Sequence, residues 1–201
     1  MARKHRDVEV ITRDTVFQGT FRVDRYRLKH RTFAGGWSEE LSREVFERKH
    51  AAALLPYDPV RDEVVLIEQF RAGAYAAGRD PWLIECVAGL IEGGETPEDV
   101  ARRETLEESG LKLLGLERIG GIFASPGAVS EFVDIFLGRV DAAGAGGLHG
   151  LDREHEDIRV FACPVHEAID LLSEGHILVG HTVVALQWLA IHRDDVRQRW
   201  T

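Results

Sequence analysis

The segment from Ala88 to Leu111, AGLIEGGETPEDVARRETLEESGL, constrains the fold of this 201-residue chain more than any other. Thr96 suits an N-cap, and Pro97 fits the first position of a helix. Gly110 is a common stop, because glycine adopts the left-handed conformation without strain. The pattern predicts a helix from Thr96 to Ser109 that is entered through a glycine-rich loop.

Three glutamates of this predicted helix, Glu104, Glu107 and Glu108, are spaced i, i+3 and i+4 and share one face. Like charges at this spacing repel by roughly 0.2–0.5 kcal/mol per pair in water. A solvated face relieved by Arg102 and Arg103 would account for them. Because the preceding loop adds more carboxylates, the alternative is a site for a hard cation such as Mg²⁺, which prefers oxygen ligands.

The net charge of −9 argues against a nucleic-acid backbone or an anionic membrane as the main partner. The chain has no apolar run near the roughly 18 residues that a membrane span needs. Cys86 and Cys163 lie in apolar runs and form no CxxC motif, so we expect buried thiols in a reducing compartment. We therefore expect a cytoplasmic protein without a nucleic-acid or membrane partner.

Short strands are predicted in the first fifty residues, and strands and helices alternate irregularly after them. Further strands are expected at 51–55 and 64–70 as a hairpin, at 82–89, 119–124, 132–140 and 158–165. Helices are expected at 166–175 and 181–195, and loops at 71–81 and 141–157. Without a regular βαβ rhythm, this order favours an α+β fold with a mixed sheet.

The order of glycine, arginine and glutamate in the first segment resembles the signature of the Nudix hydrolases, Gly-x5-Glu-x7-Arg-Glu-U-x-Glu-Glu-x-Gly-U, where U is bulky and apolar. Every charged and glycine position agrees. Thr105 at the first U position departs from the pattern, which alters packing under the helix but no ligand. The resemblance implies a Nudix fold, with a mixed sheet between helices (α/β/α). It also implies Mg²⁺-dependent (or Mn²⁺-dependent) hydrolysis of a nucleoside diphosphate linked to another moiety.

The resemblance also assigns roles within this segment. The implied metal ligands are Glu104, Glu108, the further or outer ligand Glu107, and the carbonyl of Ala88. The implied structural positions are Gly89, Glu95, Arg103 and Gly110. Of these, Arg103 would orient a glutamate through a salt bridge, and Glu95 would hold the loop to the helix.

Residues outside the signature select the substrate. Pro126 lies sixteen positions after Gly110, as in the subgroup of the family that acts on ADP-ribose, although a proline is also common in turns. Most of residues 40–192 resemble bacterial members of that subgroup, in which a small N-terminal domain is exchanged or shared between two subunits. The resemblance therefore implies a homodimer, with an N-terminal β domain at 1–49 for dimerisation and a Nudix hydrolase domain at 50–201.

The late stretch REHEDI places Glu154 and Glu156 two residues apart in the predicted 141–157 loop. A polar loop is the plain interpretation. By resemblance, Glu154 would deprotonate the attacking water and Glu156 would complete a metal site. His155 is a rival base, because its unperturbed pKa is near 6.5, whereas His149 and His181 are expected to be structural or surface residues. The candidate substrate-binding residues are Arg43, Arg71, Glu85, Ser125, Gly127 and Glu131.

The expected function is Mg²⁺-dependent hydrolysis of ADP-ribose to AMP and ribose 5-phosphate. One alternative is a nucleotide-sugar pyrophosphatase, for example one that acts on GDP-mannose. Another is a non-catalytic ADP-ribose-binding module, although the intact glutamates argue against it. A third, isomerisation of an isoprenoid diphosphate, would need an active cysteine and a second glutamate near the substrate; Cys86 lies on the strand that leads into the signature.

Overall fold

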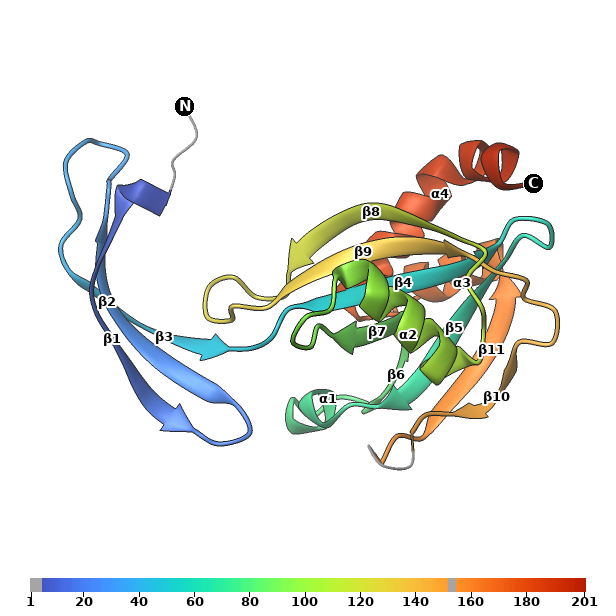
Figure 1. Ribbon diagram of the computed structural model, residues 1–201, viewed down its shortest axis with the longest axis horizontal. Coiled ribbons are helices and arrows are strands. Elements are labelled where there is room, and N and C mark those ends of the chain that lie inside the picture. The colour runs from blue at the N-terminus through green and yellow to red at the C-terminus, as the bar shows by residue number, and fades with distance from the viewer. Residues whose placement is uncertain (1–4, 152–154) are drawn as a thin grey trace. The chain divides into compact units, whose positions relative to one another are not determined.

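A computed structural model describes residues 5–151 and 155–201 of the chain (Figure 1). The chain forms two compact units. The first unit comprises Met1–His50 together with Phe123–Phe132, and the second comprises Ala51–Ile122 together with Val133–Thr201. Of the helices in the described ranges, none has the length and apolar character that crossing a membrane requires.

The first unit is built on a three-stranded antiparallel sheet that follows a short 3-10 turn at His5–Asp7. Its strands are β1 (Val8–Gln18), β2 (Arg22–His30) and β3 (Leu41–Glu47), in that order across the sheet. Residues 123–132 join this unit through β3, because the Phe46 N–H donates to the Ala128 carbonyl at 2.7 Å. The edge strand β1 is exposed along almost its whole length.

The second unit is built on an eight-stranded mixed sheet. The main path across it is β10-β11-β5-β4-β9-β8, while β6 pairs with β5 and β7 pairs with β4. The strands are β4 (Ala51–Asp58), β5 (Glu63–Phe70), β6 (Trp82–Glu85), β7 (Val87–Leu90), β8 (Gly115–Phe123), β9 (Phe132–Arg139), β10 (Gly146–His149) and β11 (Ile158–Pro164). The sheet is mixed because β4 runs parallel to β9 but antiparallel to β5 and β7.

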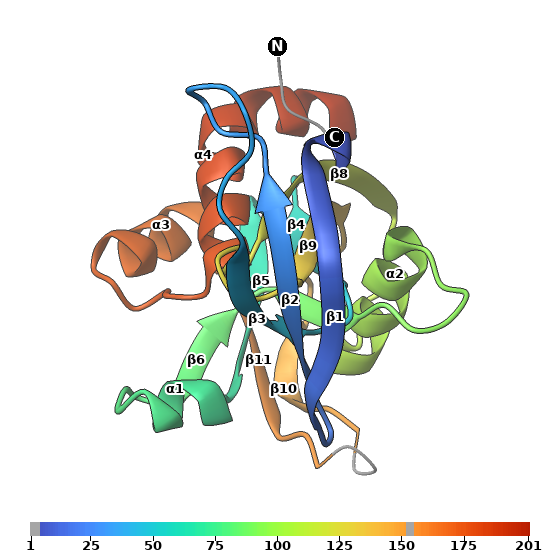
Figure 2. The ribbon, with the colours of Figure 1, turned by 90° about the vertical axis from the view of Figure 1, so that its left-hand side faces the viewer.

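Helices cover both faces of this sheet. They are the short α1 (Ala72–Ala76), α2 (Pro97–Ser109), α3 (Val165–Ser173) and α4 (Gly180–Trp200). Figure 2 shows α2 on one side of the sheet and α3 with α4 on the other. The α+β class, the mixed sheet and the α/β/α layering expected from the sequence are thus confirmed.

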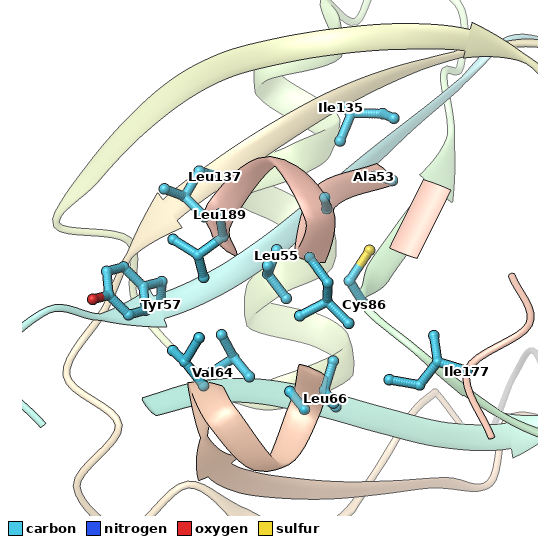
Figure 3. Close-up of a cluster of buried hydrophobic side chains, with 14 of the residues drawn as sticks. Ala53, Leu55, Tyr57, Val64, Leu66, Cys86, Ile135, Leu137, Ile177 and Leu189 are labelled. Atoms are coloured by element: carbon cyan, nitrogen blue, oxygen red, sulfur yellow. The ribbon is translucent and has the colours of Figure 1, made fainter. Parts of the chain in front are cut away.

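The main apolar core lies between the sheet and the helices α3 and α4. Alternate residues of β4, β5 and β9 point into it and meet α4, as Figure 3 shows for Leu55, Leu66, Leu137 and Leu189. All four of these side chains are fully buried. Two smaller apolar clusters lie on the α2 side of the sheet.

The strand pair β6–β7 alternates between these two sides. Cys86 packs in the main core, and its N–H donates to Thr182 Oγ1 at 3.0 Å. Val87 packs with the cluster on the α2 side, and Glu85 faces the same way because it pairs directly with Ile67. The same few residues therefore contribute to the core on one face and to a polar site on the other.

Both cysteines are buried and form no disulfide, as the sequence predicted. Burial raises the pKa of the Cys86 thiol to about 12 and that of Cys163 to about 11. A thiol with such a pKa is protonated and unreactive near neutral pH. The isomerase alternative, which needs an active cysteine, therefore loses its candidate.

Four local predictions were wrong or incomplete. The expected loop at 71–81 contains α1, since its alanines favour helix. The expected loop at 141–157 contains β10, which was hidden because glycines replace the alternating side chains of a typical strand. The expected strand at 82–89 is two strands, β6 on β5 and β7 on β4. The predicted hairpin partners pair directly only at its closed end, because β7 occupies the edge of β4 along residues 51–54.

Candidate active site

The helix predicted from the signature is confirmed as α2. The Thr96 hydroxyl accepts from the Asp99 N–H at 3.2 Å, and the Asp99 carboxylate accepts from the Thr96 N–H at 3.0 Å, which forms a capping box. Pro97 begins the helix, and Gly110 ends it with φ 68° and ψ 4° in the left-handed region. Local chemistry therefore sets both ends of the helix that carries the acidic face.

Arg103 connects the loop to the acidic face of α2. Its Nε lies 2.8 Å from Glu95, and its Nη1 lies 2.6 Å from Glu104 and 3.1 Å from Glu107. The hydrogen bond to Arg103 holds the pKa of Glu95 below its ordinary value, and the reciprocal bond raises the pKa of Arg103. One guanidinium thus offsets the repulsion of several carboxylates.

Gly89 on β7 faces this cluster. A Cβ at this position would overlap the Glu104 carboxylate, so only glycine lets that carboxylate lie against the strand. Thr105, the departure from the signature, is fully buried. Its hydroxyl donates to the Ala101 carbonyl at 2.6 Å, so the polar group is satisfied within the helix.

Glu108 is the most deeply buried carboxylate of the signature, with 3% of its surface exposed. Its Oε2 accepts from the Ala88 N–H at 3.0 Å. Its pKa is raised to about 8, mainly by burial; the charges of Glu104 and Glu156 act in the same direction, while the Ala88 N–H and Arg71 act in the opposite one. Burial also raises the pKa of Glu104. These carboxylates lie where a positive charge would stabilise their ionised forms.

The residues around Glu108 fit a hard divalent cation. Every candidate ligand offers oxygen, as such cations prefer. Across residues 5–151 and 155–201, no three acidic, histidine or cysteine side chains already stand together as a metal-binding group. Glu104 and Glu107 are turned toward Arg103, and each accepts from this guanidinium through one carboxylate oxygen.

Arg71 and Glu85 form a bidentate ion pair beside these carboxylates. The Arg71 Nε and Nη2 donate to the two Glu85 oxygens at 2.8 and 2.7 Å, and Glu85 is 1% exposed. The Arg71 guanidinium also interacts electrostatically with Glu108 and Glu156. Partly buried His181 lies near this pair, and burial lowers its pKa. The structure therefore brings Arg71 and Glu85 together with the signature carboxylates.

The predicted base Glu154 lies outside the described residues. Its neighbour Glu156 forms a closed turn with Leu151: the Leu151 N–H donates to Glu156 Oε2 at 3.2 Å, and the Glu156 N–H donates to the Leu151 carbonyl at 3.4 Å. A Cβ on Gly150 would lie 2.7 Å from Glu156 Cβ, so this turn also needs glycine. The rival base His155 is exposed, with φ 55°.

His149 supports the end of α2. A Cβ on Gly110 would lie 2.9 Å from the His149 ring, so the ring packs against the glycine backbone. The distance from His149 Nε2 to the Gly146 carbonyl is 3.0 Å, which fixes the ring orientation. This structural use agrees with the sequence interpretation of His149.

The remaining predicted substrate-binding residues belong to the first unit. Arg43 is exposed on β3. The Ser125 carbonyl accepts the N–H groups of residues 128 and 129, so Ser125 and Gly127 lie in a tight turn. Glu131 is nearly buried, and the Arg48 guanidinium lies 3.3 Å from its carboxylate. These four residues are thus held in one unit, and Arg71, Glu85 and the signature carboxylates are held in the other.

Two groups were missed in the sequence. Arg48 pairs with Glu131, and its guanidinium also lies 5.8 Å from the centre of the exposed Phe21 ring. Gln69 is buried on the α2 side of β5, next to Arg71. No motif marks either residue, although a glutamine on the same strand face as Val65 and Ile67 is a signal that could have been noticed.

The chain matches the family model of the NUDIX domain over residues 47–182. It is 51% identical over 194 residues to the ADP-ribose pyrophosphatase of Escherichia coli (strain K12), an alignment that covers 96% of this chain and 93% of that protein. It is 41% identical over 197 residues to the ADP-ribose pyrophosphatase of Haemophilus influenzae, with 96% and 91% covered.

A GDP-mannose pyrophosphatase of Cronobacter sakazakii is 37% identical over 150 residues, which cover 74% of this chain and 78% of that protein. Among solved structures, a crystal structure titled as an ADP compounds hydrolase matches with a TM-score of 0.72 at 20% identity. The match covers 98% of this chain and 100% of that one, and it shows a shared fold.

Proposed function

Because this chain belongs to the Nudix hydrolase family, we propose that it hydrolyses the diphosphate bond of ADP-ribose to give AMP and ribose 5-phosphate, with Mg²⁺ as its cation. The observation that carries the substrate is the 51% identity, over nearly the whole of both chains, to an ADP-ribose pyrophosphatase. The observation that carries the chemistry is the buried carboxylate of Glu108, which interacts electrostatically with Glu104, Glu156 and Arg71.

In the proposed reaction, a water oxygen attacks one phosphorus and the bond to the bridging oxygen breaks, while the water gives up one proton. Glu154 would accept that proton as general base. Arg71 would bind a phosphate oxygen with the part of its side chain that remains exposed. The Mg²⁺ would be held by Glu104, Glu108, Glu156 and the Ala88 carbonyl, with Glu107 as an outer ligand. The bound Mg²⁺ would offset the negative charge of the diphosphate. Mn²⁺, which accepts the same oxygen ligands, is a plausible substitute.

Glu85 would act on Arg71 and not on the substrate. Both of its oxygens accept from Arg71, and only 1% of the residue is exposed. A bidentate carboxylate fixes the plane of a guanidinium, which aims the remaining N–H groups. We therefore propose that Glu85 orients Arg71 toward the diphosphate.

A homodimer is also proposed. The exposed edge strand β1 carries several apolar side chains, among them Val10 and Phe17, which are 53% and 57% exposed. An open, apolar edge strand favours pairing with another chain. In such a dimer the first unit would supply Arg43, Ser125, Gly127 and Glu131 to the substrate. Sedimentation equilibrium should give twice the chain mass, and a monomer at micromolar concentration would contradict the proposal.

The test of the function is a substrate panel of ADP-ribose, GDP-mannose and other nucleotide sugars, with Mg²⁺ and with excess EDTA. We expect ADP-ribose to be hydrolysed fastest and EDTA to abolish turnover. Turnover of GDP-mannose that equals or exceeds that of ADP-ribose would assign the chain to the activity named for its 37%-identical relative. Calorimetric binding of ADP-ribose without turnover in Mg²⁺ would instead indicate a binding module.

A further inference from the structure

Gln69 is a buried polar residue on the catalytic side of the sheet. Only 6% of the residue is exposed. Its Nε2 is buried and has no hydrogen-bond partner within the described parts of the chain. A buried amide left without a partner is destabilising by about 1–3 kcal/mol. A group of this kind, on the same face of β5 as the fully buried Val65 and Ile67, needs an explanation beyond packing.

The register of the sheet shows which groups surround Gln69. It pairs directly with Leu83 of β6 on one side and with Ile158 of β11 on the other. Residues two positions away on a neighbouring strand lie on the same face, within reach of a long side chain. These diagonal neighbours include Glu85 on β6 and, just before β11 begins, Glu156. The register therefore places Gln69 diagonal to Glu85 on one side and to Glu156 on the other.

The two carboxylates differ in how firmly they are already held. Each oxygen of Glu85 already accepts an N–H of Arg71 at 2.8 or 2.7 Å. Glu156 accepts a backbone N–H, from Leu151, at 3.2 Å through Oε2. A carboxylate offers about four acceptor positions, so either could accept a further donor, but only Glu85 already has its plane fixed by a bidentate ion pair. The free N–H groups of Gln69 are the matching donors.

We propose that Gln69 is a positioning residue for Glu156: its Nε2 donates to the Glu156 carboxylate and aims it toward Glu104 and Glu108 in the cation-bound enzyme. The inference rests on the proposed function only in giving Glu156 a place at the cation. Groups that orient a metal ligand in this way typically change cation affinity by about 10–100-fold when removed.

The experiment uses Gln69→Met, which keeps the length of the side chain and removes its donors. Mn²⁺ affinity, measured by the electron paramagnetic resonance signal of the free ion without substrate, should fall by about 10–100-fold. The thermal midpoint of the cation-free protein should rise, because the unpartnered amide is gone. Gln69→Leu is a second neutral replacement should the methionine variant fold poorly. Gln187→Met, on the exposed face of α4, is the matched control and should change neither quantity.

A double variant tests whether the effect passes through Glu156. In a Glu156→Gln background, Gln69→Met should weaken Mn²⁺ binding by less than about twofold more, because the two residues act as a pair. A Gln69→Met protein that is more stable and binds Mn²⁺ as well as the parent would overturn the inference, as would an equal loss in both backgrounds. If the parent binds Mn²⁺ but does not hydrolyse ADP-ribose, the proposed function fails, while the Mn²⁺ comparison still tests Gln69.

Discussion

The two faces of the large sheet use the same strands for opposite purposes. Glu85 and Cys86 are adjacent and both almost fully buried, yet Cys86 packs among apolar side chains, whereas Glu85 binds Arg71 on the α2 side. Burial raises the pKa of both Cys86 and Glu108, to about 12 and about 8. For the thiol this shift only preserves a neutral group. For the Glu108 carboxylate, the raised pKa means that the ionised form is unfavourable unless a positive charge lies beside it.

This difference teaches that burial alone does not reveal what a residue does. On the α4 side, buried residues complete a close-packed core, so their loss should reduce stability. On the α2 side, the buried Glu108 opposes stability when it is ionised, so its presence there needs another reason. Substitutions in the main core and substitutions of the α2-side carboxylates should therefore separate into effects on folding and effects on turnover.

The largest effect is expected from the residue assigned to water activation. Glu154→Gln should lower kcat for ADP-ribose by roughly 10²–10⁴-fold with KM nearly unchanged, because the amide cannot accept the proton. Steady-state kinetics and a thermal melt should show lost turnover with an unchanged midpoint. If turnover stays near normal in Glu154→Gln but falls in His155→Gln, the base is the histidine.

The next effect belongs to the opposite face. Leu55→Ala removes a fully buried side chain from the main core and should lower the free energy of unfolding by about 2–5 kcal/mol. Urea unfolding measures this loss, and kcat per folded molecule should stay within about twofold of the parent. Leu114→Ala, at a residue that is 60% exposed, is the matched control. A large drop in kcat with little loss of stability would contradict the claim that the main core acts on stability and not on turnover.

The parts of the fold set by local chemistry could be predicted from sequence. Thr96, Pro97 and Gly110 define α2 because caps and stops act over a few residues. The spacing of the acidic residues on α2 follows from the helical period alone. At Gly89 the sequence and the structure contribute different parts. The signature marks the position, and the structure gives the reason, which is the close approach of the Glu104 carboxylate.

Features that depend on strand register could not be predicted. The Arg71–Glu85 pair needs β6 beside β5, and the burial of Gln69 needs Ile158 beside it, although the two residues lie far apart in the sequence. The glycines of β10 conceal a strand because they remove the alternation that identifies one. The role of Glu154 rests on resemblance to the family, because the residue lies outside the described structure.

A smaller effect should come from the glycine beneath the acidic face. Gly89→Ala places a Cβ where the Glu104 carboxylate lies, so the Mg²⁺ concentration needed for half-maximal activity should rise by about 10–100-fold. Gly93→Ala is the matched control, because an added Cβ there meets nothing within 4 Å. Mg²⁺ titrations of initial rate give the comparison. Equal behaviour of the two variants would show that the close approach of Glu104 is not needed for cation binding.

On the α2 side of the sheet, ionising the buried Glu108 is unfavourable, and a bound cation should relieve this cost. Glu108 has a pKa of about 8 in the folded chain against an ordinary value of 4.5, so the folded state binds more protons between these values. Stability contributed by this group therefore falls as pH rises through that window. Glu104 and Glu156 carry charges that act in the same direction on Glu108.

The most direct measurement is the thermal midpoint of the parent and of Glu108→Gln from about pH 5 to about pH 8.5, with and without Mg²⁺. Without Mg²⁺, the midpoint of the parent should fall relative to that of the variant as pH rises. With Mg²⁺ at the alkaline end, the parent should regain stability, while the variant should respond much less. Parallel pH curves, or the same Mg²⁺ shift in both proteins, would contradict the account.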